Sequence, residues 1–297
     1  MKVSVIIVCM NRPVVLFPCL DSIRAHTNVP YEVLIVAYCF SGEHLQALKS
    51  RYPWVRVIES AQTRGFSENN NLALREAKGT YCLILNDDTL MKMPVIDFLV
   101  KDIESLPENA AAVQPKIVFG DGRVQTCGRA PWSAWRYMKH YLHRVDETRP
   151  TRWSMQQGLF PSYTLNGACF LIKTAVFREE GWFDERFFFT PEDIALGHKL
   201  NAAGYSVWAD ADVVITHLAG TTVSPMEAAI KPVRVKGALL FYGEGKWLKT
   251  MALSLFVWSV EAFRYLKHLG HCDSARNILR SVFDGASAKE TFLRFRP

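Results

Sequence analysis

The sequence lacks the cysteine patterns that would define a disulfide framework or a zinc site. It has seven cysteines, and none belongs to a CxxC pair or a zinc-type spacing. Several lie inside apolar runs, where cysteine behaves as a small hydrophobic residue. An odd, scattered set is typical of a reducing compartment, so we expect a cytoplasmic protein.

Long hydrophobic runs and two nucleotide-binding patterns are also missing. The N-terminal apolar run stops at Asn11, which is too early for a signal peptide. No stretch reaches the roughly 18 uninterrupted apolar residues of a membrane-spanning helix. No GxGxxG follows the first apolar run, and no GxxxxGKS/T occurs. These absences weigh against dinucleotide-binding Rossmann proteins and P-loop NTPases.

The composition is that of a globular protein with a large core. Hydrophobic residues make up 49% of the 297 residues, and the formal net charge is +6. The length fits one large α/β domain or two small ones. The positive charge favours an acidic partner, whether nucleotide phosphates, an anionic membrane surface or nucleic acid, and does not choose among them.

Apolar runs alternate with segments of helical spacing in the first half of the chain. Strands are predicted at 2–10, 31–37, 55–60, 81–85 and 110–118. Helices are predicted at 14–26, 42–52, 68–77 and 91–106. Alternation of this kind indicates βαβ units, so we predict an α/β fold with a mostly parallel central sheet.

Asn86, Asp87 and Asp88 directly follow the fourth predicted strand. Ligands gather at the carboxyl ends of strands in an α/β sheet. Carboxylate oxygens suit Mg²⁺ or Mn²⁺, and such ions often share their remaining positions with substrate phosphates. The same residues are good turn formers, so the triplet alone also fits a solvated turn.

The second half is less regular and carries further polar candidates. Between Trp132 and Arg144 aromatic and basic residues are mixed, which suits nucleic-acid binding, an acceptor-side lid or a surface excursion. Glu192 and Asp193 begin a predicted helix, where acidic residues ordinarily complement the helix dipole. His217 follows the last two predicted strands, at 205–209 and 213–216, and a lone His is usually structural.

Several motifs occur together in an order that resembles family-2 glycosyltransferases. They are Ser4–Arg12, Arg64–Asn71, Leu85–Thr89, Gly167–Ile172, Phe183–Phe188 and Glu192-Asp193. The chain is most similar to bacterial rhamnosyltransferase-like members with the GT-A fold, over roughly residues 1–220. The resemblance implies an inverting, hexosyltransferase-like enzyme of surface polysaccharide synthesis. Such an enzyme moves a sugar from a nucleoside-diphosphate donor to a saccharide or lipid-linked acceptor.

The resemblance also implies a role for each matched residue. Asp193 is expected to be the catalytic base, and Glu192 to orient the acceptor or the base. Asp88 and His217 are expected to bind Mg²⁺ or Mn²⁺. The expected donor-binding residues are Asn11, Arg12, Tyr38, Arg64, Gly65, Asn70 and Asp87.

The sequence departs from the family pattern at three places. The family usually has an Asp after the second strand that contacts the base, and here Ala37–Phe40 takes its place. Base recognition is therefore expected to differ, for example by stacking on Tyr38 or Phe40. The metal motif begins with Asn86 rather than Asp, and Ala195 stands where the family often has a further Asp.

We expect the chain to divide at residue 225. Residues 1–225 form the GT-A catalytic domain, with a nucleotide-binding half at 1–119 and an acceptor-side half at 120–225. Residues 226–297 form a C-terminal helical extension.

The C-terminal extension has predicted helices at 226–243, 247–268 and 273–283. Its basic and aromatic residues beside an apolar helical face suit a peripheral membrane surface, and equally suit a catalytic domain or a second subunit in a homodimer. Arg294 and Arg296 are expected in a loose basic tail.

Three alternatives remain beside the transferase. A nucleotidyltransferase could also use paired carboxylates, although Met10–Pro13 is not the Gly-rich basic loop that it would favour. A nucleic-acid-binding protein built on the segment from Trp132 to Arg144 would show salt-sensitive binding, although we expect no nucleic acid. A non-catalytic relative would bind nucleotide without turnover.

Overall fold

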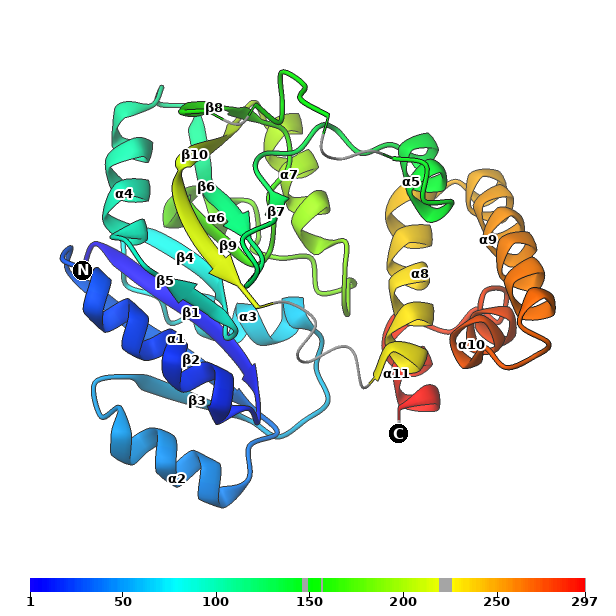
Figure 1. The fold of residues 1–297 in the computed structure, drawn as a ribbon, viewed down its shortest axis with the longest axis horizontal. Helices are drawn as coiled ribbons and strands as arrows, with labels where there is room; N and C mark the ends of the chain where they lie inside the picture. The colour runs from blue at the N-terminus through cyan, green and yellow to red at the C-terminus, as the bar shows by residue number, and fades with distance from the viewer. Residues whose placement is uncertain (146–148, 156, 219–225, 297) are drawn as a thin grey trace.

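A computed structural model describes residues 1–145, 149–155, 157–218 and 226–296. Within these ranges a ten-stranded sheet runs through the centre with helices on both faces (Figure 1). Along its main path the strands follow in the order Arg56–Ser60 (β3), Tyr31–Tyr38 (β2), Val3–Met10 (β1), Tyr81–Asn86 (β4), Cys169–Lys173 (β9), Ala110–Val118 (β6), Ser206–His217 (β10) and Thr89–Met91 (β5). Val124–Thr126 (β7) lies beside β6, and Leu159–Ser162 (β8) lies beside β10. On that path only β9 and β5 run against the other strands. The predicted α/β fold with a mostly parallel sheet is confirmed.

The first half of the chain contains strands and helices close to the predicted positions. Its strands are β1 (Val3–Met10), β2 (Tyr31–Tyr38), β3 (Arg56–Ser60), β4 (Tyr81–Asn86) and β5 (Thr89–Met91). Its helices are α1 (Pro13–His26), α2 (Gly42–Arg51), α3 (Phe66–Leu74) and α4 (Val95–Ser105). The helix expected at 91–106 therefore begins later, because the short strand β5 comes before it.

The second half adds the remaining strands and two helices beside the sheet. Its strands are β6 (Ala110–Val118), β7 (Val124–Thr126), β8 (Leu159–Ser162), β9 (Cys169–Lys173) and β10 (Ser206–His217). Its helices are α5 (Ala134–Tyr141), α6 (Thr174–Glu179) and α7 (Glu192–Ala202). The two strands expected at 205–209 and 213–216 are one strand, β10, whose register against β6 shifts between Asp210 and Val214.

The sheet is buried on both faces, as its continuous apolar strands require. On one face Val5 and Ile7 belong to a core that also contains residues of α1, α2 and α4. On the other face Ile6 and Ile84 pack with residues of α3, α6 and α7. Polar groups that meet solvent are therefore concentrated at the strand ends.

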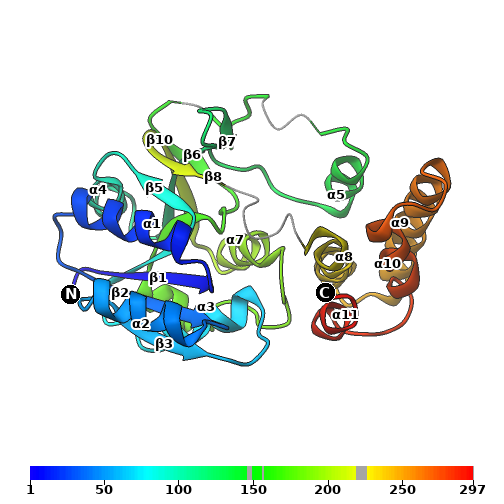
Figure 2. The ribbon, with the colours of Figure 1, turned by 60° about the horizontal axis from the view of Figure 1, so that its bottom comes forward.

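Four C-terminal helices gather on one side of the sheet, and α7 lies between them and the strands (Figures 1 and 2). They are α8 (Glu227–Gly243), α9 (Trp247–Lys267), α10 (Asp273–Ser281) and α11 (Ala288–Phe295). The expected loose tail is wrong for Arg294, which lies in α11 and bonds Asp284 at 2.5 Å. None of the described helices is both long enough and apolar enough to cross a bilayer.

The aromatic residues around α5 are largely packed against the C-terminal helices. Tyr137 stacks on Tyr242 with ring centroids 4.8 Å apart, and Trp132 is only 6% exposed. Tyr141 donates a hydrogen bond to Glu261 of α9. Trp135 is an exception, since it is exposed. Most of these rings therefore belong to a core and are not free to stack on nucleic-acid bases.

Candidate active site

The pairing of β5 with β10 brings His217 to Asp88. In this antiparallel pair His217 lies opposite Thr89, the residue after Asp88. His217 Nε2 is 3.1 Å from Asp88 Oδ1, and the two side chains are 10% and 7% exposed. The Asn86 amide nitrogen is 3.2 Å from the same imidazole nitrogen. The two expected metal ligands are therefore neighbours, although they come from distant parts of the chain.

Gln125 of β7 fixes the orientation of the His217 ring. Its Oε1 lies 2.8 Å from His217 Nδ1, and because a carbonyl oxygen only accepts, Nδ1 carries the proton. In the neutral ring Nε2 then carries the lone pair, which accepts a hydrogen bond from the Asn86 amide and lies beside Asp88 Oδ1. A histidine that ligates a metal usually has such a partner on its other nitrogen. Gln125 could not be predicted, because it lies in a segment of the sequence without periodicity.

The Asp88–His217 pair fits a cation that is shared with a substrate. The described residues contain no cluster of three or more His, Cys, Asp or Glu side chains able to hold a metal alone. Mg²⁺ is commonly bound through one or two carboxylates together with substrate phosphates. A carboxylate and an imidazole lone pair that face one another match that partial ligand set.

The Asp87 side chain has different neighbours from those of Asp88. Burial raises the pKa of Asp87 to about 6, and the nearby Asp88 charge adds to the rise. Cys9 bonds the Asp87 carboxyl, and the Arg12 charge also acts on it. The structure thus brings Asp87 and Arg12 together at the ends of β4 and β1.

Asp193, the expected base, is held by three donors at the start of α7. Arg129 Nη1 and the Gly167 N–H both contact Oδ2 at 3.1 Å. The Ile194 N–H donates to Oδ1 at 2.7 Å. Cationic and N–H donors stabilise an ionised carboxylate. Arg129 was not predicted, since an Arg in a loop carries no positional signal.

The segment 166–168 connects Asp193 to Asp88 and His217. The Gly167 N–H bonds Asp193, and the Ala168 carbonyl accepts from the Asn86 N–H at 2.9 Å. β9 runs against β4, so its beginning lies at the edge of the sheet where β4 ends. Asn86 also contacts His217. The expected base and the expected metal ligands are therefore parts of one hydrogen-bonded assembly.

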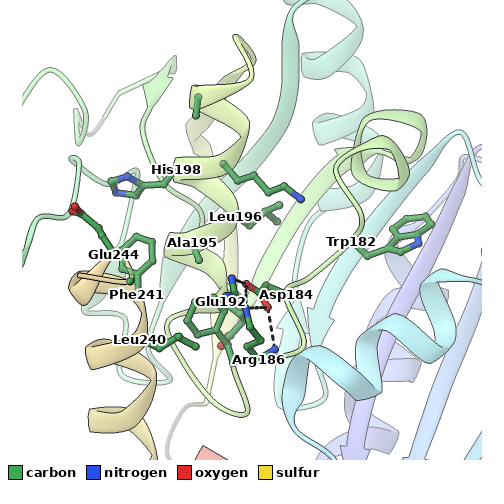
Figure 3. A pocket seen from close by; sticks show the side chains of 14 residues that line it. Trp182, Asp184, Arg186, Glu192, Ala195, Leu196, His198, Leu240, Phe241 and Glu244 are labelled. Carbon is green, nitrogen blue, oxygen red and sulfur yellow. Dashed lines mark hydrogen bonds and ion pairs between the residues drawn. The ribbon is translucent and has the colours of Figure 1, made fainter. Parts of the chain in front are cut away.

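Glu192 is buried beside the base and lines a cavity. Burial, and then the adjacent Asp193 charge, raises the pKa of Glu192, and its Oε2 has no hydrogen-bond partner among the described residues. The cavity, of about 670 Å³, lies between α7, the end of α8 and the segment before α7. Figure 3 shows Glu192 near the Asp184–Arg186 ion pair in its wall. Glu192 is the one predicted site residue that lines this cavity.

The remaining expected donor-binding residues lie near strand ends and form hydrogen bonds within the protein. Asn11 Oδ1 accepts from the Ser41 N–H at 2.9 Å and lies 2.8 Å from His44 Nδ1, which joins the end of β1 to α2. Tyr38 is 9% exposed, and its hydroxyl contacts the Thr63 side chain and the Arg64 backbone. Little of the Tyr38 ring is available for stacking on a base.

Arg64, Gly65 and Asn70 lie at or near the start of α3. Arg64 bonds Ser60 Oγ at 3.0 Å and Gln62 Oε1 at 2.9 Å, and Asn70 bonds a carbonyl of its own helix. A Cβ on Gly65 would lie 2.4 Å from the Phe188 carbonyl oxygen, so this position requires glycine. The donor contacts of these three residues stay a prediction.

The fold and this assembly define a class of protein. The mostly parallel α/β sheet carries Asp88, His217 and Asp193 in one hydrogen-bonded assembly where its strands end. The model of the family "Glycosyl transferase family 2" matches residues 4–167. The chain belongs to glycosyltransferase family 2, and it is a glycosyltransferase.

Two curated relatives are each 30% identical to the chain. O-antigen biosynthesis protein RfbC of Myxococcus xanthus matches over 226 residues, which are 73% of this chain and 17% of that protein. N-acetylglucosaminyl-diphospho-decaprenol L-rhamnosyltransferase of Mycobacterium tuberculosis matches over 224 residues, 68% of this chain and 72% of the relative. The chain therefore spans most of the second relative but a small part of the first.

Solved glycosyltransferase structures share the fold at low identity. GalNAc-T7, solved with UDP, GalNAc and Mn²⁺, has a TM-score of 0.59 and 19% identity over 73% of this chain and 43% of its own. The mannosyltransferase PcManGT of Pyrobaculum calidifontis, solved with GDP-Man and Mn²⁺, has a TM-score of 0.56 and 17% identity over 99% of this chain and 78% of its own. The predicted GT-A fold is thereby confirmed.

Proposed function

We propose that this glycosyltransferase is an inverting, metal-dependent enzyme of bacterial surface polysaccharide synthesis. It moves a sugar from a nucleoside-diphosphate donor to a saccharide or lipid-linked acceptor. The observation that carries the proposal is the hydrogen-bonded connection from Asp88 and His217 through Asn86 and segment 166–168 to Asp193. The names of the two relatives, one in O-antigen biosynthesis and one acting on a diphospho-decaprenol acceptor, support the pathway and the acceptor class.

Asp88 and His217 hold Mg²⁺ or Mn²⁺ in this proposal. When bound, the ion neutralises charge that develops on the departing diphosphate. Two fold neighbours were solved with Mn²⁺ together with UDP or GDP-Man, which supports a divalent ion at a nucleotide site. Arg12 and Asp87 adjoin the pair from β1 and β4 and contact the donor.

Asp193 acts as the general base. A carboxylate oxygen takes the proton of the acceptor hydroxyl while that hydroxyl oxygen forms a bond to the anomeric carbon of the donor sugar. The bond from the anomeric carbon to the donor phosphate oxygen breaks in the same step, and the nucleoside diphosphate leaves. One displacement inverts the anomeric configuration. Glu192, whose Oε2 has no partner among the residues that the structure describes, orients the acceptor.

A thermal-shift screen tests the donor site. The ligands are UDP, dTDP, GDP, CDP and their common sugar conjugates, each with and without Mn²⁺. A ligand that binds only the folded state raises the unfolding temperature, so one nucleotide is expected to give a metal-dependent shift. No shift with any nucleotide contradicts the proposal, and a shift that does not need metal removes Asp88 from its role.

Two substitutions separate donor binding from transfer. Asp88→Ala is expected to abolish metal-dependent donor binding, because it removes the carboxylate ligand. Asp193→Asn is expected to keep donor binding and to lose transfer about a hundredfold or more, since general-base catalysis contributes roughly that factor. Asp121→Ala, at an exposed carboxylate bonded to Arg123, is the control for both. Retained transfer in Asp193→Asn would rule this residue out as the base.

A further inference from the structure

Helix α11 packs against the part of the chain that contains the expected donor residues Arg64 and Gly65. Figure 2 shows α11 on the side of the C-terminal helices that faces α3. The β3–α3 loop, residues 61–65, connects the end of β3 to the first residue of α3. Three contacts join α11, and the residue directly after it, to this loop, to the start of α3 and to the segment that supports them.

The first contact is a buried aromatic pair. The Phe292 ring of α11 lies against the Phe188 ring with centroids 5.0 Å apart, and the two residues are 6% and 7% exposed. The Phe188 carbonyl oxygen accepts a hydrogen bond from the Phe66 N–H at 2.8 Å. The same oxygen is so close to Gly65 that a Cβ on this glycine would lie 2.4 Å from it. A displacement of Phe188 would therefore move the end of the β3–α3 loop.

The second contact is an ion pair with the first turn of α3. Lys289 Nζ of α11 lies 3.5 Å from Glu68 Oε1. The other oxygen of this carboxylate, Oε2, accepts a hydrogen bond from the Gly65 N–H at 3.0 Å. Lys289 therefore holds the carboxylate that fixes the last residue of the loop.

The third contact comes from Arg296, which directly follows α11. Its Nη1 donates to Thr63 Oγ1 at 3.4 Å, and the Thr63 side chain also contacts the hydroxyl of Tyr38, another expected donor residue. Both polar contacts are partly exposed, and exposed polar pairs contribute little stability. The buried packing of Phe292 on Phe188 is therefore the main anchor between α11 and the loop.

We propose that Phe292 is a positioning residue for donor binding and acts through Phe188 and the β3–α3 loop. The inference rests on the proposed function, because it requires that Arg64 and Gly65 contact the donor. A loop that is already fixed before its ligand arrives loses less conformational entropy on binding. Phe292 thus raises the affinity for the donor and leaves the chemical step unchanged.

Hydrogen–deuterium exchange tests the support of the loop without any ligand. Phe292→Ala is expected to speed exchange of the backbone N–H groups of residues 63–68 about tenfold or more, since loss of a buried aromatic ring costs more free energy than that ratio represents. Leu253→Ala is the matched control. Leu253 is 3% exposed and belongs to a different core cluster of the C-terminal helices. Its loss should cost comparable stability and leave exchange at residues 63–68 as in wild type.

Calorimetry with UDP, dTDP, GDP and CDP, each with Mn²⁺, measures the effect on the donor site. We expect the nucleotide that wild type binds to have a Kd about tenfold higher in Phe292→Ala, the size of one lost charge-assisted hydrogen bond. Phe292→Met should stay near wild type, because methionine keeps a large apolar side chain that fills irregular gaps. In transfer assays the donor KM should rise about tenfold in Phe292→Ala at nearly constant kcat. Leu253→Ala should keep both values.

Each alternative has its own signature. Equal nucleotide affinities of wild type and Phe292→Ala, or equal exchange at residues 63–68, would overturn the proposal. A lower kcat at unchanged nucleotide affinity would mean that Phe292 acts through the segment before Glu192, and equal losses in Phe292→Ala and Leu253→Ala would mean a purely structural role. Both results contradict donor positioning. If wild type binds none of the nucleotides, the proposed function fails, whereas exchange still decides whether Phe292 holds the loop.

Discussion

Glu192 and Asp193 are adjacent carboxyls with different surroundings. Asp193 has an arginine and two N–H donors, whereas one oxygen of Glu192 is buried and has no hydrogen-bond partner within the part of the chain that the structure describes. Burial therefore raises the pKa of Glu192, and the Asp193 charge adds to this. A neutral Glu192 can donate a hydrogen bond, as the acceptor-orienting role proposed above requires. The two adjacent carboxyls therefore differ in their hydrogen-bond partners.

The raised pKa of Glu192 predicts a pH-dependent stability. Between the ordinary glutamate pKa of about 4.3 and the raised folded value, the folded state holds a proton that the unfolded state has released. The free energy of unfolding therefore falls as pH rises through this window, by at most about 1.4 kcal/mol per pH unit from this group. Glu192→Gln removes this contribution. The melting temperature of the variant minus that of wild type should therefore increase from pH 5 to pH 8. A constant difference would contradict this.

At the residue scale the sequence predicted those side chains that follow a strand or begin a helix. Asp88 and His217 come at strand ends, where ligands gather, and the structure brings them together. Gln125 and Arg129, which hold His217 and Asp193, could not be found because they lie in a stretch without periodicity. Arg64 matched a family motif, yet the structure bonds it within its own loop. A motif identifies a position and not the direction of its side chain.

Three helices are joined by the buried carboxylate of Glu261. This residue of α9 is fully buried, and Tyr141 of α5 donates to its Oε1 at 2.6 Å. Lys231 of α8 lies 3.4 Å from Oε2, and Arg264 of α9 pairs with Oε1. A buried charge is tolerated only when it is paired and hydrogen-bonded. The position of α5 thus depends on its contacts with the C-terminal helices.

We expect Glu261→Ala to lower the free energy of unfolding by about 3 kcal/mol. This value is the lower end for breaking a buried ion pair, because the side chains of Lys231 and Arg264 are about a quarter exposed. Denaturant unfolding measures the change. Glu227→Ala removes an exposed pair with Arg234 and should cost no more than about 1 kcal/mol. Similar losses in the two variants would show that the three-helix network does not stabilise the fold.

At the element scale, continuous apolar runs were enough to place the central strands within a few residues. The short strand β5 was missed because three residues carry no alternation, and its partner lies far away in the sequence. α5 was missed for a related reason. Its aromatic residues form a face that packs on α8 and α9, and the helix has no fully buried residue of its own. Such an element takes its place from tertiary contacts.

The outer face of α9 is the most apolar exposed helix surface described in the molecule. Leu248, Phe263 and Leu266 are 75%, 68% and 72% exposed, and Trp247 and Leu255 are also exposed. Its one carboxylate, Glu261, is buried, so the exposed charges of this helix are basic. An apolar face with basic flanks complements an anionic bilayer. We therefore propose that α9 lies on the cytoplasmic membrane face.

Vesicle binding tests the proposed membrane surface. The protein is expected to sediment with vesicles that contain anionic lipid, and less with neutral vesicles. The double substitution Leu255→Gln and Leu266→Gln should reduce binding about tenfold or more, since each buried leucine contributes roughly 1.5–3 kcal/mol. Phe98→Gln, on α4 at the other side of the molecule, is the control.

The vesicle experiment could instead indicate that α9 binds a second copy of the chain. The protein could fail to bind vesicles, and the double substitution could convert a homodimer to a monomer in sedimentation analysis. In that case α9 is a subunit interface and the membrane proposal is wrong. The predicted division at residue 225, with the C-terminal extension after it, stays a prediction. The sequence could not choose between membrane and protein, because periodicity describes a face and not what covers it.

The strand that carries His217 is the last one of the sheet to be synthesised. A nascent chain that has left the ribosome only as far as β6 can possess Asp88 but not the imidazole that lies beside it. The proposed ion site is therefore complete only once β10 has joined the sheet, and a nascent chain that ends before β10 lacks the pair. If donor binding needs both residues, as proposed above, such a chain does not bind the nucleotide sugar.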